Sequence, residues 1–133
     1  MGNRAVIAFG TEPDATGIYL HWNGGRDSVQ AFLDAAKQLG VRENDGEYQP
    51  ARLCQIIGNF MSGSSLSLGV GALKTLDCNN GDNGTYVVNG EFKIVERRYH
   101  KGDEQFDKAQ YEGVLAETLR KNKPLFEKGG NNV

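Results

Sequence analysis

The sequence predicts an α+β fold, with a small antiparallel sheet that contains a β-hairpin at about 85–95 and is packed on one face by about three helices. Three observations predict this fold class. Two short runs of β-forming residues lie near the N-terminus, an Asn-Gly hairpin pattern lies in the second half, and three stretches carry apolar residues at helical spacing. The expected order is two strands, two helices, one strand, the hairpin and a last helix.

The first two strands are predicted from short apolar runs that end in glycine-containing turns. Residues 5–9 read Ala-Val-Ile-Ala-Phe and are closed by Gly10. Residues 17–22 are also rich in β-forming side chains and are followed by a turn-forming stretch at 23–25. We expect the two strands to pair through the turn at 10–16.

Two amphipathic helices are predicted after these strands. Asp27 with Gln30 three residues later is a helix-start pattern, and Gly40 is a typical helix end. Between them the apolar residues repeat along one helical face, at Val29, Phe32, Leu33, Ala36 and Leu39. Pro50 favours the first turn of a second helix, whose apolar residues cover more than one face and predict burial: Leu53, Cys54, Ile56, Ile57, Phe60 and Met61. The small-residue stretch at 63–71 is compatible with a loop or an irregular strand.

The clearest local pattern predicts a β-hairpin. The β-forming runs Thr85–Val88 and Phe92–Val95 flank the pair Asn89-Gly90. A two-residue type I′ turn needs positive φ at both turn residues, which Asn and Gly tolerate best. We therefore expect a tight turn at Asn89 and Gly90.

Apolar spacing predicts a final helix from about Asp103 to about Asn122. Its inward side chains are expected to be Phe106, Tyr111, Val114, Leu115 and Leu119. The helix should stop before Pro124, because the residue that precedes a proline disfavours the helical conformation. Residues 128–133 are expected to form a flexible C-terminal end.

The composition predicts one domain over residues 1–133. The chain has 133 residues, of which 38% are hydrophobic, and no linker or internal repeat divides it. Its 15 basic and 17 acidic residues give a net charge of −2, which argues against a dedicated nucleic-acid binder and against an acidic DNA mimic. No apolar stretch reaches about 18 residues and no secretion signal begins the chain, so we expect a cytoplasmic protein with no membrane partner. Cys54 and Cys78 should then be free thiols.

Five polar or aromatic side chains lie between the second predicted strand and the first helix: His21, Trp22, Asn23, Arg26 and Asp27. Ligands are often bound at such a turn. Gly24 and Gly25 let the backbone approach a ligand closely, and the free N–H groups of a helix start favour an anion. In the alternative interpretation the same residues are structural, because Asn23 makes the turn, Asp27 caps the helix and Trp22 packs.

A second candidate site is the basic and aromatic stretch that leaves the hairpin, with Lys93, Arg97, Arg98 and Tyr99. Such a stretch can bind RNA or an acidic protein surface. Strand alternation predicts that Lys93, Val95, Arg97 and Tyr99 project together and that Arg98 lies opposite. The alternative is an edge strand that its charges protect from aggregation.

No metal and no cofactor are expected. The stretch Asp77–Gly84 alternates oxygen ligands with glycine as a calcium loop does, but it departs from the EF-hand pattern where Gly and Glu are required. The cysteines and histidines lack the Cys-x-x-Cys and His-x₃-His spacings of zinc sites. A cysteine nucleophile with a histidine base is conceivable from Cys54 or Cys78 and His21 or His100, and Cys78 is the better candidate because it lies in a polar loop. The catalytic residues of an enzyme are otherwise unknown.

Several segments resemble a group of short uncharacterised bacterial proteins that are often carried by prophages and plasmids. The resemblance spans about residues 4–98 and rests on Arg4–Ile7, Ile18–Val29, Ala51–Gln55, Leu76–Asp77 and Asp82–Tyr86. It supplies no activity and no catalytic residue. It implies a context, in which small mobile-element proteins commonly act by binding and blocking a host factor.

These observations predict a noncatalytic protein-binding module, as in a mobile-element-encoded modulator of a host or phage protein. No group of residues has the spacing that catalysis usually requires, so an enzyme is the less favoured class. Two alternatives stay open: a small enzyme or ligand-binding domain that uses the His21–Asp27 turn, and an RNA-binding domain that uses the basic stretch at 93–101. The oligomeric state is not indicated.

Overall fold

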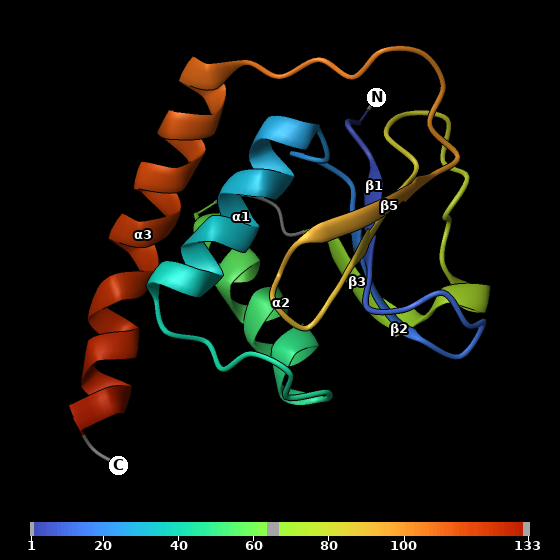
Figure 1. Cartoon of the computed structure of the whole chain (residues 1–133). Coiled ribbons are helices and arrows are strands. Elements are labelled where there is room, and N and C mark those ends of the chain that lie inside the picture. The colour runs from blue at the N-terminus through green and yellow to red at the C-terminus, as the bar shows by residue number, and fades with distance from the viewer. Residues whose placement is uncertain (1, 64–66, 132–133) are drawn as a thin grey trace.

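A computed structural model describes residues 2–63 and 67–131, of which 127–131 are described by their backbone alone. Over these residues it shows a five-stranded mixed sheet, three α-helices and a short 3₁₀ helix, which confirms the predicted α+β class (Figure 1). The elements in chain order are β1 (Ala5–Ala8), β2 (Thr16–Leu20), α1 (Arg26–Gln38), α2 (Tyr48–Phe60), β3 (Leu68–Ala72), η1 (Leu73–Thr75), β4 (Thr85–Val88), β5 (Ile94–Arg98) and α3 (Lys108–Asn131). The small-residue stretch therefore ends in a strand, while its residues 64–66 lie outside the described residues.

The strand order in the sheet is β3-β2-β1-β4-β5. β1 pairs antiparallel with β2, as predicted, from Ala5 opposite Leu20 to Ala8 opposite Gly17. One pair departs from the antiparallel expectation, because β4 lies parallel to β1. The chain passes through α1, α2 and β3 before it returns beside β1, and a long crossover of this kind permits parallel pairing.

One face of the sheet forms the hydrophobic core with α1 and α2. Alternate side chains of β1, β2 and β4 point to this face and are buried: Ala5, Ile7, Ile18, Leu20, Tyr86 and Val88. α2 adds Leu53, Ile56 and Ile57 to the same core, so its predicted burial is confirmed. α3 packs against α1 and α2 on the side away from the sheet (Figure 1). The three helices therefore lie on one side of the sheet, as predicted, with α1 and α2 next to the sheet and α3 in a second layer.

The start of α1 differs in detail from the expected capping pattern. Its N-cap is Gly25, so Asp27 is not the cap. Asp27 lies in the first turn, where one carboxylate oxygen accepts the N–H of Ser28 and the other accepts the N–H of Asp107. A negative charge there still favours the helix through its dipole. Gly40 follows the helix with a φ of 81°, as expected of a helix end.

The predicted hairpin is confirmed by the pairing of β4 with β5, but the predicted tight turn is wrong. Asn89 and Gly90 do not take positive φ, whereas Phe92 does, at 58°. The Asn89 side chain accepts the N–H groups of Glu91 and Lys93 and so closes a longer loop. Phe92 is fully buried, and the free energy gained by burying its ring outweighs the local preference of the Asn-Gly pair.

α3 begins later than predicted. One carboxylate oxygen of Asp107 accepts the N–H groups of Ala109 and Gln110, at 2.9 and 3.2 Å, and this cap sets the helix start. The start near Asp103 was therefore wrong, because apolar spacing does not register the cap. Phe106, an expected inward residue, precedes the helix and is exposed.

α3 also passes the proline that should end it. Pro124 lies inside the helix, which continues to Asn131. Asn122 is fully buried and donates its side-chain amide to the carbonyl of Ile56 in α2. This anchor on α2 favours the helix beyond Asn122, against the local preference of the proline. The expected flexible end at 128–133 therefore starts as helical backbone, and its final part lies outside the described residues.

The opposite face of the sheet is covered in part by η1 and the loop that follows it (Figure 1). Leu73 and Leu76 rest on Gly17 of β2, where a Cβ atom would lie 2.7 and 2.8 Å from their methyl carbons. This close approach requires glycine at position 17. The partial cover leaves a hollow beside Ala8 and Val87.

Candidate functional site

His21 and Trp22 pack against each other just after β2. The hydroxyl oxygen of Tyr19 lies 2.9 Å from His21 Nδ1, and the ring centroids of His21 and Trp22 are 5.3 Å apart, edge to face. Trp22 is 47% exposed, so it is not buried in the fold as the structural interpretation expects. Asn23 has a φ of 59° and makes the turn, as that interpretation expects.

Arg26 and Asp27 contact a different part of the chain, the segment 99–107 that leads into α3. Arg26 Nη1 lies 3.1 Å from a carboxylate oxygen of Glu104, and Asp27 accepts the N–H of Asp107 at 3.3 Å. Both contacts hold the segment against the start of α1. The structure therefore divides the five residues of the predicted turn between separate sets of contacts.

The second predicted site is divided by an irregularity in β5. Val88 pairs with Ile94, but Val87 pairs with Glu96, so Val95 is an extra residue on this strand. Side-chain alternation does not hold across such a bulge. The prediction that the basic and aromatic residues share one side of the strand is therefore wrong.

Arg97 turns into the fold. Its guanidinium carbon lies 3.7 Å from the centre of the Tyr86 ring, and the group donates to the carbonyl of Asn83 and pairs with Glu104. The side chain is 17% exposed, and burial lowers the pKa of Arg97. Arg97 therefore stabilises the β4–β5 region and is not free to contact RNA. Lys93 is exposed in the loop before β5.

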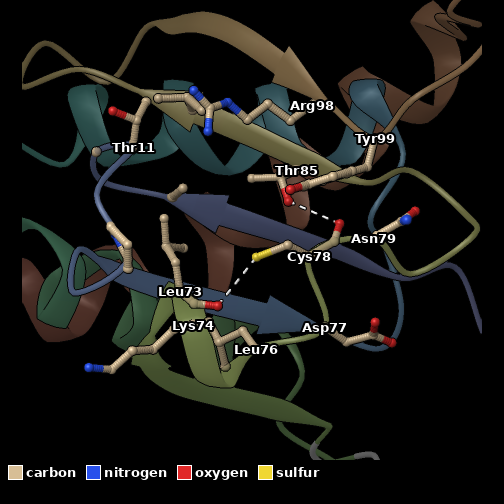
Figure 2. A pocket seen from close by; sticks show the side chains of 14 residues that line it. Thr11, Leu73, Lys74, Leu76, Asp77, Cys78, Asn79, Thr85, Arg98 and Tyr99 are labelled. Atoms are coloured by element: carbon tan, nitrogen blue, oxygen red, sulfur yellow. Dashed lines mark hydrogen bonds between the residues drawn. The ribbon is translucent and has the colours of Figure 1, made fainter.

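Arg98 and Tyr99, which alternation places apart, line the same hollow on the face of the sheet opposite α1 and α2. They meet there because Tyr99 takes a positive φ of 58°. Figure 2 shows them along the upper rim, with Thr85 and Cys78 below. The hollow has a volume of about 550 Å³. Its apolar lining comes from Ala8, Val87, Leu73 and Leu76.

The polar groups around the hollow form hydrogen bonds and an ion pair within the protein. Thr85 donates its hydroxyl to the carbonyl of Cys78 at 3.1 Å, and Cys78 Sγ lies 3.6 Å from the carbonyl oxygen of Leu73. Arg98 pairs with Glu96, whose hydrogen bond and negative charge raise the pKa of Arg98. Among the described residues that line the hollow there is no histidine. A Cys78 nucleophile would therefore lack an imidazole base at this site.

The free edge of the sheet at β3 is a feature that the sequence analysis missed. β3 pairs with β2 on one side, and among the described strands none lies on its other side. The chain from 60 to 73 carries no charged side chain, whereas β5 at the opposite edge carries Glu96, Arg97 and Arg98. Edge strands are ordinarily protected by charge, so the uncharged run was the sequence feature that could have indicated an unprotected edge here.

An apolar groove with a volume of about 490 Å³ lies between β3 and α2. It is lined mainly by Pro50, Ala51, Cys54 and Gly58 of α2 and by Leu68 and Val70 of β3. Val70 is 57% exposed although its side chain is aliphatic. Burial raises the pKa of the Cys54 thiol, so this group stays protonated and behaves as a small apolar side chain.

The loop at 77–84 uses its polar groups within the protein. The side-chain amide of Asn80 donates to the carbonyl of Gly84, and its oxygen accepts the N–H groups of Asp82 and Gly84. Asp82 pairs with Arg4 at 2.8 Å, and this contact lowers the pKa of Asp82. In the part of the chain that the structure describes, no three His, Cys, Asp or Glu side chains come together in a way that could hold a metal ion.

No protein-family model matches this chain, and comparisons with curated proteins and with solved structures found no match either. Across the described residues, none of the helices has the length and apolar character that a membrane span needs. The β3 edge with its groove, and the hollow on the sheet face opposite α1 and α2, are the two candidate binding surfaces.

Proposed function

We propose that this chain is a noncatalytic protein-binding module that adds an extended segment of its partner to the free edge of β3. The observation that carries the proposal is an uncharged edge strand beside an apolar groove. In strand addition, main-chain hydrogen bonds supply affinity, and alternate side chains of the added strand enter neighbouring pockets.

The hydrogen bonds between β2 and β3 define which backbone groups face outward. The N–H of His21 donates to the carbonyl of Ser67, and the N–H of Leu73 donates to the carbonyl of Ala15. In an antiparallel sheet, alternate residues of a strand bond to alternate neighbours, so the odd-numbered residues of β3 face β2. The outward-facing N–H and C=O groups are therefore those of Leu68, Val70 and Ala72.

The side chains of β3 direct an added strand toward the groove. Val70 lies opposite Ile18, which points into the helical core, so Val70 projects to the same side as α2. Gly69 and Gly71 alternate with it and place no side chain on the other face. A strand paired with β3 would therefore set every second side chain over the groove between β3 and α2.

The surface suits a partner segment that is apolar and uncharged. Neither the run from 60 to 73 nor the groove-lining residues of α2 carry a charge. Covering this surface requires no desolvation of an ion, which is the largest cost of burying a polar surface. The partner is then recognised by its backbone and its apolar side chains.

A bound protein also agrees with the context that the sequence resemblance implies. Mobile-element proteins of this size commonly block a host or phage protein, and strand addition can do so without a catalytic group. Cys54 and Cys78 are both free, which fits the reducing cytoplasm where such a partner would be met.

Two variants at Val70 test the proposal against a matched control. Val70→Pro removes an outward N–H, and Val70→Lys places a charge beside the groove, and neither change removes a hydrogen bond to β2. Val95→Lys is the control, because Val95 is 59% exposed, close to the 57% of Val70, but lies on the opposite edge strand. All three variants are expected to melt within a few degrees of the wild type.

The measurement is the capture of a partner protein from a bacterial lysate. A photo-crosslinking residue replaces Gln55, an exposed residue of the groove, and identifies the partner segment that lies there. We expect wild type and Val95→Lys to crosslink the same partner segment. Both Val70 variants should capture this segment in an amount at least about tenfold smaller. Equal retention by the Val70 variants, or the absence of a crosslinked segment at Gln55, would overturn strand addition at this edge.

A further inference from the structure

We propose that the hollow on the sheet face opposite α1 and α2 binds a small molecule with a flat aromatic ring and one carboxylate. This site lies away from the β3 groove and does not depend on strand addition. Three separate observations support it: the size and lining of the hollow, the conformation of Tyr99, and the charge at the rim.

The hollow has the size and lining of a ligand pocket. Its volume of about 550 Å³ lies within the range of about 300–1,000 Å³ that small-molecule sites span. Ala8 and Val87 are buried at its base, and Leu73 and Leu76 form a wall that rests on Gly17. Because the sheet supports this wall, the hollow is pre-formed, and its apolar surface suits a ring.

Tyr99 is held at the rim in a backbone conformation that bulky residues disfavour. Its φ is 58°, and the side chain is 55% exposed. Gly84 permits this path of the chain, because a Cβ atom there would overlap the carbonyl oxygens of Arg98 and Tyr99. Residues held under such strain cluster at ligand sites, and an exposed ring beside an apolar surface is available for stacking.

The charges that line the hollow favour an anion. Arg98 and Lys74 are cationic, whereas Asp77 is the one carboxylate among the lining residues that the structure describes. Asp77 lies 3.8 Å from Arg4, and Lys74 lies 2.6 Å from Asp14. In Figure 2 the Lys74 side chain extends away from the other labelled residues of the hollow, so Arg98 is the cation that a ligand there can engage.

Arg98 can exchange its present partner for a ligand. It pairs with Glu96, and the two side chains are 42% and 44% exposed. Exposed pairs of this kind contribute little to stability, so replacing Glu96 by a ligand carboxylate costs little. A guanidinium group can bind a carboxylate through two parallel hydrogen bonds. Thr11 lines the same hollow, on the side toward which Arg98 extends in Figure 2, and supplies a hydroxyl.

The test is an NMR titration of the ¹⁵N-labelled protein with indole-3-carboxylate and with its neutral match, indole-3-carboxamide. We expect the carboxylate to shift the amide signals of Thr11, Tyr99 and residues 73–78 saturably, and the carboxamide to bind about tenfold more weakly. Arg98→Gln should remove the advantage of the carboxylate. Arg120→Gln is the control, because Arg120 is likewise exposed and paired with a nearby glutamate.

Tyr99→Gly separates a binding role from a structural one. The change relieves the positive φ, so the melting temperature is expected to be unchanged or higher while the probe binds more weakly. Val70→Lys should bind the probe as the wild type does, which distinguishes failure of this site from failure of strand addition. The proposal is overturned if no signal shifts saturably at millimolar probe, if the carboxamide binds equally well, or if Arg98→Gln binds like the wild type.

Discussion

At the scale of single residues, Tyr86 connects the sheet to the start of α1. Its ring is fully buried, its hydroxyl donates to the carbonyl of Gly24 at 2.7 Å, and the guanidinium of Arg97 lies over the ring. Burial raises the pKa of Tyr86 to about 12, because the ionised phenolate would lose its hydration. The folded protein therefore retains this proton at a pH where a free tyrosine has lost it.

We expect Tyr86 to make the protein sensitive to alkali between about pH 10 and pH 12. An unfolded tyrosine has a pKa of about 10, so in this range the unfolded state loses a proton that the folded state keeps. The stability that the protonated form contributes is complete below about pH 10 and is lost as the pH rises through about 12, a loss of about 3 kcal/mol. Denaturant unfolding near pH 8 and near pH 12 should show a larger loss for the wild type than for Tyr86→Phe. Equal losses in the two proteins would contradict the prediction.

At the scale of elements, the hairpin loop contains a glycine, Gly90, that is required by its contact with Asn44 and not by the conformation of its own turn. Gly90 lacks a positive φ, but a Cβ atom there would overlap the side-chain oxygen of Asn44. The N–H of Asn44 and the side-chain amide of Gln49 both donate to the carbonyl of Gly90, at 2.9 and 2.7 Å. The hairpin loop is thus docked on the connection between α1 and α2.

Gly90→Ala should therefore destabilise the protein by about 1–3 kcal/mol, because the added methyl group overpacks this contact. Asn44→Gly should restore most of the loss, since Asn44 already takes a φ of 55°, which glycine adopts without strain. Gly40→Ala is the comparison, because Gly40 has a φ of 81° and open space around it. The stability lost in Gly40→Ala therefore reports backbone strain alone. Denaturant titration gives the unfolding free energies, and a loss in Gly90→Ala that Asn44→Gly leaves unchanged would rule out this contact as its cause.

Elements that a local run or a regular spacing of apolar residues marks could be predicted from the sequence. β1, β2 and the β4–β5 hairpin lie close to their expected positions because runs of β-forming residues mark them, and α1 and α2 do so because their apolar residues repeat at helical spacing. Contacts between residues distant in sequence decided the rest. α3 continues past Pro124 because Asn122 bonds to α2, and β4 pairs parallel with β1 because of a crossover that local patterns do not reveal.

For the candidate sites too, residue types could be predicted from the sequence, whereas their spatial arrangement could not. Arg98 and Tyr99 could be identified as candidates from their residue types, but the bulge at Val95 and the left-handed backbone of Tyr99 decide that they share a hollow. Arg97 has the same residue type as Arg98, and only its packing against the Tyr86 ring shows that it is structural. The uncharged run at 60–73 indicated an unprotected β3 edge. Which strand lies at an edge depends on the strand order of the sheet, and the sequence does not reveal that order.

At the scale of the whole molecule, the segment 99–107 connects the last strand to α3 and crosses the start of α1 (Figure 1). One carboxylate within it, that of Glu104, pairs with Arg26 of α1 and with Arg97 of β5. The N–H of Asp107 also donates to Asp27. Glu104 therefore links the segment that precedes α3 to both α1 and β5.

Glu104→Gln should destabilise the protein more than the loss of an exposed ion pair does. The change leaves the guanidinium groups of Arg26 and Arg97 without the negative charge between them, while the Arg97 side chain is only 17% exposed. Breaking a fully buried pair costs about 3–5 kcal/mol, and the partial exposure of Glu104 reduces the expected loss to about 1–3 kcal/mol. Glu112→Gln, which removes an exposed pair with Lys108, should cost at most about 0.5 kcal/mol. If unfolding measurements give both variants the same small loss, the position of this segment is set by its backbone and not by the charge of Glu104.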